Sequence, residues 1–381
     1  MTHDLLMNIT FIQICKLRKG VFTLDKHLSF IKDMGNKDFN VEEFLESRDA
    51  QRLKQIDFFM GNQEDGKIIL DYWESFEKGL IKKVFGDPEK QETRWALYIP
   101  KAAVEQKSSR KFPLIFCLHG AHNPIALTQS YGVIQVAARE EAFVITPENE
   151  RLDNLTELFT IVKNQYPIDS GRVYGIGYSF GAFMTSQNAL SNPSMFAGIG
   201  MGGMIFAGKV GEHEMGGVQY PSFEATEEMV ANAAEKKMPM LLFLGEHEML
   251  NLVPIWKTQD YFREDGVIDL SAEAKSAAFN TFRKVAGCTP AKFTNVEGAS
   301  CDLGNPVTKV SGVEFERSEV RVYNGRKYYI GDSVNGSNEC LFRTVVCEKM
   351  MHWTTEKFAE LVWEHIGKYA RDAKTGQMIL L

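Results

Sequence analysis

Ser179 lies at the centre of the segment Gly177-Tyr178-Ser179-Phe180-Gly181, which fits the pattern G-x-S-x-G. A serine in this pattern can act as a nucleophile when it occupies a sharp turn from a strand into a helix, because that turn exposes its hydroxyl. A strand-like run, Arg172 to Ile176, precedes the segment, and a helix-compatible run, Ala182 to Leu190, follows it. Gly177 and Gly181 relieve the crowding of such a turn. We therefore predict that Ser179 is a nucleophile rather than an idle serine in a glycine-rich turn.

The nucleophile requires a base, and in folds with this turn an acid and then a histidine follow the serine along the chain. The histidines after Ser179 are His213, His247, His352 and His365. His352 follows a strand-like run, Leu341 to Cys347, and precedes a helix-like segment, so it is expected in a loop beyond a strand. His365 falls on the apolar face of that helix, which favours packing. His352 is the predicted base.

Acidic residues follow another apolar run, Met240 to Leu244, which is predicted to be a strand. Glu246 and Glu248 both lie just beyond it, and either could orient the histidine. Glu248 is preferred because it lies a few residues past the strand end, whereas Glu246 could be a solvated turn residue. Asp260 is a more distant candidate.

Acyl transfer builds up negative charge on an oxygen, which needs two backbone N–H donors. One comes from the residue after the nucleophile, here Phe180, and one from the loop after an early strand. The predicted second donor is Ala121, because the preceding Gly120 lets the backbone approach a substrate closely. His119 and His122 have the spacing of metal ligands, but no third ligand accompanies them. We therefore expect a loop-shaping role for them and no metal or organic cofactor.

The elements that would position these residues alternate between strand and helix. The continuous apolar runs Leu114 to Leu118 and Phe143 to Thr146 are typical of strands covered on both faces by helices. Thr93 to Ile99 alternates as in a half-buried strand. Further strands are expected at Val173 to Ile176, Ala197 to Met201 and Met240 to Leu244, with helices around Leu155 to Val162 and Phe183 to Leu190. This order predicts an α/β fold with a mostly parallel, doubly wound sheet and helices on both faces.

The composition of the chain restricts the kinds of molecule that the protein is expected to bind. With 43 Lys and Arg against 50 Asp and Glu, the formal charge is -7, which disfavours nucleic-acid binding. The 6 cysteines form no Cys-x-x-Cys pair and are expected to be mostly reduced thiols. The sequence shows no recognisable signal peptide and no apolar stretch long enough to span a membrane. We therefore expect a cytoplasmic protein without membrane contact, or a secreted one if the native start is missing. The oligomeric state stays open.

The 381 residues favour one large domain with additions. Residues 1–85 are predicted to form a mainly helical appendage, because Asn40 and Glu43 fit a capping box ahead of an apolar stripe. Residues 86–381 would form the catalytic domain. Insertions at about 202–237 and 256–327 interrupt the alternation, and such insertions commonly cover an active site.

The run from Ile168 to Thr185 closely resembles the nucleophile region of polyhydroxybutyrate-depolymerase-like and feruloyl-type esterases of the α/β-hydrolase superfamily. Pro113 to Ala121, Pro193 to Gly200 and Gly287-Cys288-Thr289 are similar to other stretches of that family, over residues 93–370 in all. The chain departs from it in carrying Glu248 where aspartate is usual, and Trp353-Thr354 after the histidine.

The resemblance implies hydrolysis of a small-molecule or oligomeric ester through an acyl-enzyme on Ser179, with His352 as base. Two alternatives stay open. One is a serine peptidase of the same fold, whose insertions would admit peptides. The other is a binding protein that captures a ligand without turning it over.

Overall fold

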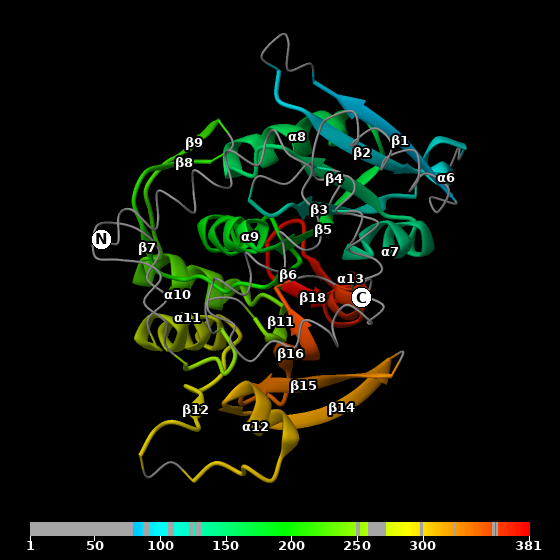
Figure 1. The fold of residues 1–381 in the computed structure, drawn as a ribbon. Helices are drawn as coiled ribbons and strands as arrows, with labels where there is room; N and C mark the ends of the chain where they lie inside the picture. Colours follow the sequence, from blue (N-terminus) through cyan, green and yellow to red (C-terminus); the bar gives the residue numbers. More distant parts are fainter. Residues whose placement is uncertain are drawn as a thin grey trace, which may run out of the picture.

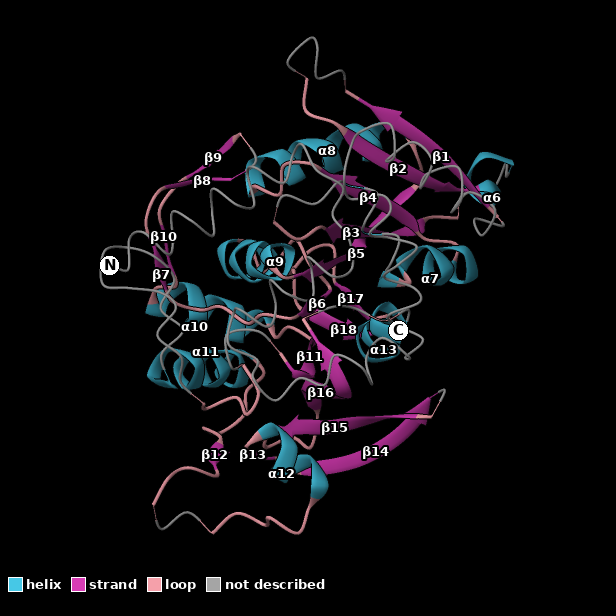
Figure 2. Ribbon diagram, viewed as in Figure 1, coloured by secondary structure: helices cyan, strands magenta, loops and turns pink. Residues whose placement is uncertain are grey.

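The computed structural model describes residues 79–86, 92–105, 110–121, 125, 128, 131–215, 217–248, 252–257, 272–297, 300–323, 325–352, 355 and 357–381. Its centre is a 10-stranded sheet with the strand order β1-β2-β4-β3-β5-β6-β11-β16-β15-β14 (Figures 1 and 2). The strands are β1 (Leu80–Phe85), β2 (Trp95–Pro100), β3 (Phe112–Leu118), β4 (Phe143–Pro147), β5 (Ile168–Tyr178), β6 (Gly198–Gly202), β11 (Met240–His247), β14 (Arg317–Tyr323), β15 (Arg326–Val334) and β16 (Cys340–Met351).

The middle of the sheet is parallel and both of its margins are antiparallel. From β4 through β3, β5, β6 and β11 to β16, every neighbouring pair is parallel. β1 and β2 at one margin, and β15 and β14 at the other, pair antiparallel. Every residue of β3 and β4 is buried, as their continuous apolar runs predicted. The predicted α/β class with a mostly parallel sheet is confirmed.

Helices cover both faces of this sheet (Figure 1). α8 (Leu152–Gln165), α9 (Phe180–Ser191), α10 (Glu227–Lys236) and α11 (Ala272–Val285) contribute to the hydrophobic cluster of one face. α7 (Val133–Glu140) and α13 (Lys357–Ile366) contribute to the cluster of the other face. Along β3, Leu114 and Phe116 belong to the first cluster while Ile115 and Cys117 belong to the second, because side chains alternate along a strand.

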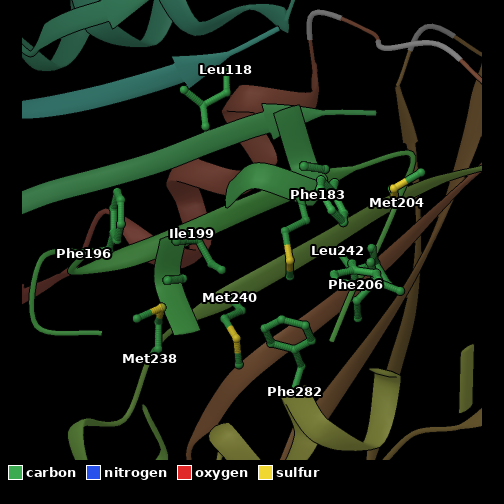
Figure 3. Close-up of a cluster of buried hydrophobic side chains, with 14 of the residues drawn as sticks. Leu118, Phe183, Phe196, Ile199, Met204, Phe206, Met238, Met240, Leu242 and Phe282 are labelled. Atoms are coloured by element: carbon green, nitrogen blue, oxygen red, sulfur yellow. The ribbon is translucent and has the colours of Figure 1, made fainter. Parts of the chain in front are cut away.

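The first of these clusters fills the space between β6, β11 and the helices (Figure 3). Phe183, Ile199, Met240 and Leu242 are at most 1% exposed, and Phe206 is 4% exposed. Full burial of one such side chain contributes about 1.5–3 kcal/mol to the free energy of unfolding. The strands that carry the loops described below are therefore anchored in a dense core.

The sheet begins earlier than the sequence indicated. β1 lies within the segment 1–85 that was predicted to be a mainly helical appendage, and it pairs with β2 along its whole length. The apolar residues Leu80, Ile81, Val84 and Phe85 have a spacing that suits one face of a helix as well as a strand, so pairing with β2 decides the conformation. Residues 1–78 lie outside the described residues.

Short elements occupy the two segments predicted to be insertions. Residues 202–237 contain the strand pairs β7 (Lys209–Val210) with β10 (Phe223–Glu224) and β8 (His213–Met215) with β9 (Val218–Tyr220), followed by α10. The described part of 256–327 contains α11, α12 (Pro306–Ser311), the pair β12 (Lys292–Phe293) with β13 (Val313–Glu314), and β14. The remaining elements are α6 (Lys101–Glu105) and the C-terminal pair β17 (Tyr369–Arg371) with β18 (Met378–Leu380).

Candidate active site

Ser179 occupies the sharp turn between β5 and α9, in a backbone conformation that non-glycine residues rarely adopt. Its φ is 55° and its ψ is -120°. Such a conformation costs on the order of 1–3 kcal/mol and persists only where its surroundings enforce it. Here the Ser179 N–H donates to the carbonyl of Gly202 at 2.8 Å, and the Ser179 carbonyl accepts from Phe183 N–H at 3.1 Å. The serine as a whole is half-buried.

The two glycines of the motif are required by close backbone contacts. A Cβ on Gly177 would lie 2.2 Å from the carbonyl oxygen of Gly181. A Cβ on Gly181 would lie 2.3 Å from the carbonyl oxygen of Leu118, at the end of β3. The first turn of α9 therefore approaches the loop after β3 at a distance that only glycine allows.

We expect Gly181→Ala to lower kcat by roughly 10²-fold, because the helix start must move away from the loop after β3 and an expected N–H donor moves with it. Gly336→Ala is the matched control, since a Cβ there meets nothing within 4 Å. Steady-state rates and thermal melts of both variants provide the measurement. Equal rates for the two variants would contradict the role given to this contact.

The structure brings Ser179, His352 and Glu248 together. His352 Nε2 lies 2.8 Å from Ser179 Oγ, and His352 Nδ1 forms a short hydrogen bond with Glu248 Oε1. Glu248 is 3% exposed and His352 is 8% exposed. A carboxylate facing Nδ1 favours the tautomer that carries its proton there, which leaves Nε2 free to accept the serine proton.

Neighbouring strands place the acid and the histidine. Glu248 follows β11, where its N–H donates to the Gly245 carbonyl at 3.1 Å and its Oε2 accepts from the Gly245 N–H at 3.0 Å. β16 pairs parallel with β11, so His352, the residue after β16, lies at the same edge of the sheet. Because β5 runs in the same direction, its end carries Ser179 to this edge as well.

Glu246, the other acid weighed from the sequence, has a different partner. Its Oε2 accepts from the backbone N–H of Lys349 at 2.8 Å, which ties the end of β11 to the end of β16. The register between β11 and β16 shifts between Gly245 and His247. Regular strand alternation therefore does not extend to Glu246 and Glu248. Asp260 and His122 lie outside the described residues.

Tyr178 is a residue that sequence reasoning did not single out. Its ring lies 5.2 Å from the His352 ring, centroid to centroid, and its hydroxyl forms a hydrogen bond with Glu248. Burial, and then the negative charge of Glu248, raise the pKa of Tyr178 well above its usual value, so the phenol keeps its proton and donates it. The feature of the sequence that could have drawn attention to Tyr178 is its position next to Ser179 at the end of a strand. Successive side chains of a strand point to opposite faces.

We expect Tyr178→Phe to lower kcat about 10-fold, because Glu248 loses a donor that holds it against His352. Tyr174→Phe is the matched control on the same strand, since its hydroxyl donates to the carbonyl of Tyr369 at 2.7 Å. Steady-state kinetics of the two variants make the comparison. If Tyr178→Phe performs like Tyr174→Phe, Tyr178 does not position the acid.

The predicted oxyanion donors lie on either side of the same close contact. Phe180 is the first residue of α9, so its N–H is among those of the first turn that have no acceptor within the helix. Ala121 lies in the loop after β3, whose Leu118 and His119 carbonyls face Gly181. The two backbone segments therefore meet at Gly181, two residues after Ser179.

Aromatic side chains pack around Phe180. The Phe180 ring is 5.6 Å from that of Phe183 and 5.3 Å from that of Tyr220. Tyr220, on β9, stacks on His213, on β8, at 5.2 Å. The segment 202–237 thus contacts the residue that follows the serine.

The other predicted residues have structural surroundings. His365 is fully buried, and burial lowers its pKa to about 3, as a packed neutral histidine requires. Cys117, Cys288, Cys301, Cys340 and Cys347 are free thiols. In the described ranges, no group of His, Cys, Asp and Glu is arranged to hold a metal ion, and none of the helices there has the length and apolar character of a membrane span.

A strained serine at the end of β5, followed at once by α9, sits above a parallel sheet whose later strands bring an acid and a histidine to it. The chain has the α/β-hydrolase fold. The order of serine, acid and histidine along the chain is also the one known for that fold.

Comparison with known proteins returned similar structures only. No protein-family model and no curated protein matches the chain. An acetyl xylan esterase from Aspergillus awamori is 13% identical with a TM-score of 0.45, over 75% of this chain and 99% of that one. A thermostable esterase is 18% identical with a TM-score of 0.34, over 55% of this chain and 53% of that one. FphF, a fluorophosphonate-binding serine hydrolase of Staphylococcus aureus, is 15% identical with a TM-score of 0.35, over 44% of this chain and 78% of that one.

At these identities and TM-scores, the similarity says nothing about the chemistry of this chain. The match spans about half of the thermostable esterase, 53% of its length. The chemistry of this chain therefore rests on its own residues.

Proposed function

We propose that this protein is a serine hydrolase that cleaves a carboxylic ester through an acyl-enzyme intermediate, with Ser179, Glu248 and His352 as its triad. The observation that carries the proposal is the pair of contacts made by one imidazole, 2.8 Å from the Ser179 hydroxyl on one side and hydrogen-bonded to buried Glu248 on the other. A hydroxyl is a weak nucleophile on its own, and this arrangement is the one that activates it.

In the first half of the reaction, Ser179 Oγ attacks the ester carbonyl carbon while His352 Nε2 takes the hydroxyl proton. The resulting imidazolium is stabilised by the Glu248 side chain, which faces His352 Nδ1. His352 then gives the proton to the departing alkoxide, and the alcohol leaves an acyl group on Ser179.

The tetrahedral intermediate carries a negative oxygen, for which the N–H groups of Phe180 and Ala121 are the proposed donors. In the second half, His352 Nε2 takes a proton from water while the hydroxide attacks the acyl carbon. The bond between this carbon and Ser179 Oγ then breaks, His352 returns the proton to Ser179 Oγ, and the acid leaves. None of these steps requires a group beyond the chain and water.

The aromatic side chains around Phe180 support this chemistry by limiting the water beside the reacting atoms. Phe180, Phe183 and Tyr220 are all buried, and fewer water molecules nearby strengthen the electrostatic interactions of the intermediate.

A hydrolysis screen tests the proposal. Wild-type protein and Ser179→Ala are assayed on acetyl, medium-chain acyl and hydroxycinnamoyl p-nitrophenyl esters and on aminoacyl arylamides. We expect turnover of at least one ester class that Ser179→Ala abolishes. Higher activity on arylamides than on esters would instead favour a serine peptidase. No turnover of either class, together with no labelling of Ser179 by a fluorophosphonate, would favour a ligand-binding protein.

A further inference from the structure

A second buried histidine–glutamate pair, outside the proposed triad, joins the loop after β3 to the segment after β4. His119 is 7% exposed and Glu150, just beyond β4, is 1% exposed. His119 Nδ1 lies 2.8 Å from the carbonyl oxygen of Gly120. A carbonyl can only accept, so His119 Nδ1 carries a proton and donates it to Gly120.

The other nitrogen of this ring faces Glu150. His119 Nε2 lies 3.3 Å from Glu150 Oε1, and among the described residues neither atom has a hydrogen bond, so each is the nearest polar partner available to the other. Because Nδ1 already donates, a proton on Nε2 or on Oε1 would let these two atoms form a hydrogen bond. Without that proton a nitrogen lone pair would face a carboxylate in a buried place, which is unfavourable. Burial also raises the pKa of Glu150, in keeping with a retained proton.

Further contacts fix Glu150 from two directions. Its Oε2 accepts from the Tyr220 hydroxyl at 2.7 Å, and its backbone carbonyl accepts from the side-chain amide of Asn188, on α9, at 2.8 Å. Tyr220 in turn packs edge-on against Phe180 at 5.3 Å. The pair is therefore linked to both segments that carry the proposed oxyanion donors.

The bond to Gly120 has a geometric consequence for Ala121. The Gly120 carbonyl and the Ala121 N–H belong to one peptide group, and in a trans peptide these two groups point in opposite directions. Holding the Gly120 oxygen against His119 therefore sets the direction of the Ala121 N–H.

We propose that His119 and Glu150 are positioning residues for the oxyanion site: Glu150 holds the His119 ring, and His119 holds the Gly120–Ala121 peptide so that the Ala121 N–H points at the developing charge. This inference rests on the proposed function and adds a second His–Glu pair that serves the intermediate rather than the nucleophile.

The test uses His119→Phe, Glu150→Leu, the double variant and Glu150→Gln. His119→Phe keeps a ring without its hydrogen bonds. Glu150→Gln keeps them, because an amide N–H can donate to Nε2 while the amide oxygen accepts from Tyr220. Glu148→Leu is the matched control from the same segment. Glu148 accepts hydrogen bonds from Arg94, at 2.9 Å from the side-chain Nε and at 3.2 Å from the backbone N–H.

Two measurements distinguish a misdirected Ala121 N–H from a general loss of structure in the variants. One is the second-order rate of Ser179 labelling by a fluorophosphonate, which also develops charge on an oxygen and needs no knowledge of the natural substrate. The other is the affinity for a trifluoromethyl ketone, an analogue of the tetrahedral intermediate, compared with KM for an ester.

We expect His119→Phe and Glu150→Leu each to slow labelling by about 10- to 10²-fold and to weaken ketone binding by a similar factor, with KM changed little. The double variant should lose no more than His119→Phe alone, because both act through one peptide group. Glu150→Gln should recover most of the labelling rate, and Glu148→Leu should retain it.

The proposal is overturned if His119→Phe labels at the wild-type rate, or if Glu150→Gln loses as much as Glu150→Leu. Should Glu150→Leu fail to fold, His119→Phe and Glu150→Gln still decide. A wild-type protein that neither labels at Ser179 nor cleaves esters contradicts the proposed function and this inference together, whereas an active wild type with unaffected variants contradicts the inference alone.

Discussion

Ser179→Ala is expected to lower kcat on short p-nitrophenyl esters by about 10⁴-fold or more, since removing the nucleophile of a serine triad typically costs that much. The loss should be in kcat with little change in the melting temperature, because alanine fits the turn in which Ser179 sits at φ 55° no worse than serine does. Initial rates at saturating ester, with enzyme in the micromolar range, measure the residual activity.

Ser186→Ala is the matched control for that experiment. Ser186 lies on the same helix, and its hydroxyl donates to the carbonyl of Ala182 at 2.9 Å, away from the histidine. We expect it to keep kcat within about threefold, as for most conservative changes away from a site. Retained ester turnover in Ser179→Ala would show that another group performs the chemistry.

Glu248→Gln is expected to lower kcat by about 10⁴-fold, because an amide facing His352 Nδ1 can stabilise the wrong tautomer and cannot stabilise the imidazolium. KM should change little, since Glu248 is buried behind the histidine. Steady-state kinetics on the best ester of the screen provide the measurement.

Glu246→Gln is the control that decides between the two acids. Its side chain binds the Lys349 N–H, and the amide oxygen of glutamine can still accept that bond. We expect less than about a threefold loss of kcat. The acid would be misassigned if Glu246→Gln lost more activity than Glu248→Gln.

The parts of the fold that the sequence predicted well are those with strong local signals. β3, β4 and β11 are continuous apolar runs, and a buried strand between helices requires such runs. The position of Ser179 in the turn between β5 and α9 could be predicted because a strained turn between strand and helix needs glycine on both sides. The position of His352 just beyond β16 could be predicted because it follows a strand-like run and lies off any apolar face.

Other features depend on contacts between distant parts of the chain. Glu248 meets His352, and Glu246 meets the Lys349 N–H, where the ends of β11 and β16 come together and their register shifts, and no local pattern reveals these pairings. Tyr178 meets Glu248, and Tyr220 meets Glu150, only after the sheet and the segment 202–237 have formed. β1 was missed because its apolar spacing suits a helix equally well.

The His352 ring contacts Ser179 through Nε2 and Glu248 through Nδ1, and Glu248 places a negative group behind the histidine. Glu248 accepts from the Gly245 N–H and the Tyr178 hydroxyl as well as from His352, so its buried oxygens are surrounded by donors. A buried carboxylate is tolerated only with such partners. The site is therefore organised before a substrate arrives, which is the condition for efficient stabilisation of a charged intermediate.

The most direct measurement of the central claim is covalent labelling by a fluorophosphonate, followed by peptide mass spectrometry of wild-type protein and of Ser179→Ala. A serine activated by His352 and Glu248 should form one phosphonyl adduct, on the peptide that contains Ser179, at a rate far above that of an ordinary serine, and the Ser179→Ala protein should form none. An unlabelled wild-type protein, or an adduct at any other residue that persists in Ser179→Ala, would contradict the assignment of Ser179 as the nucleophile.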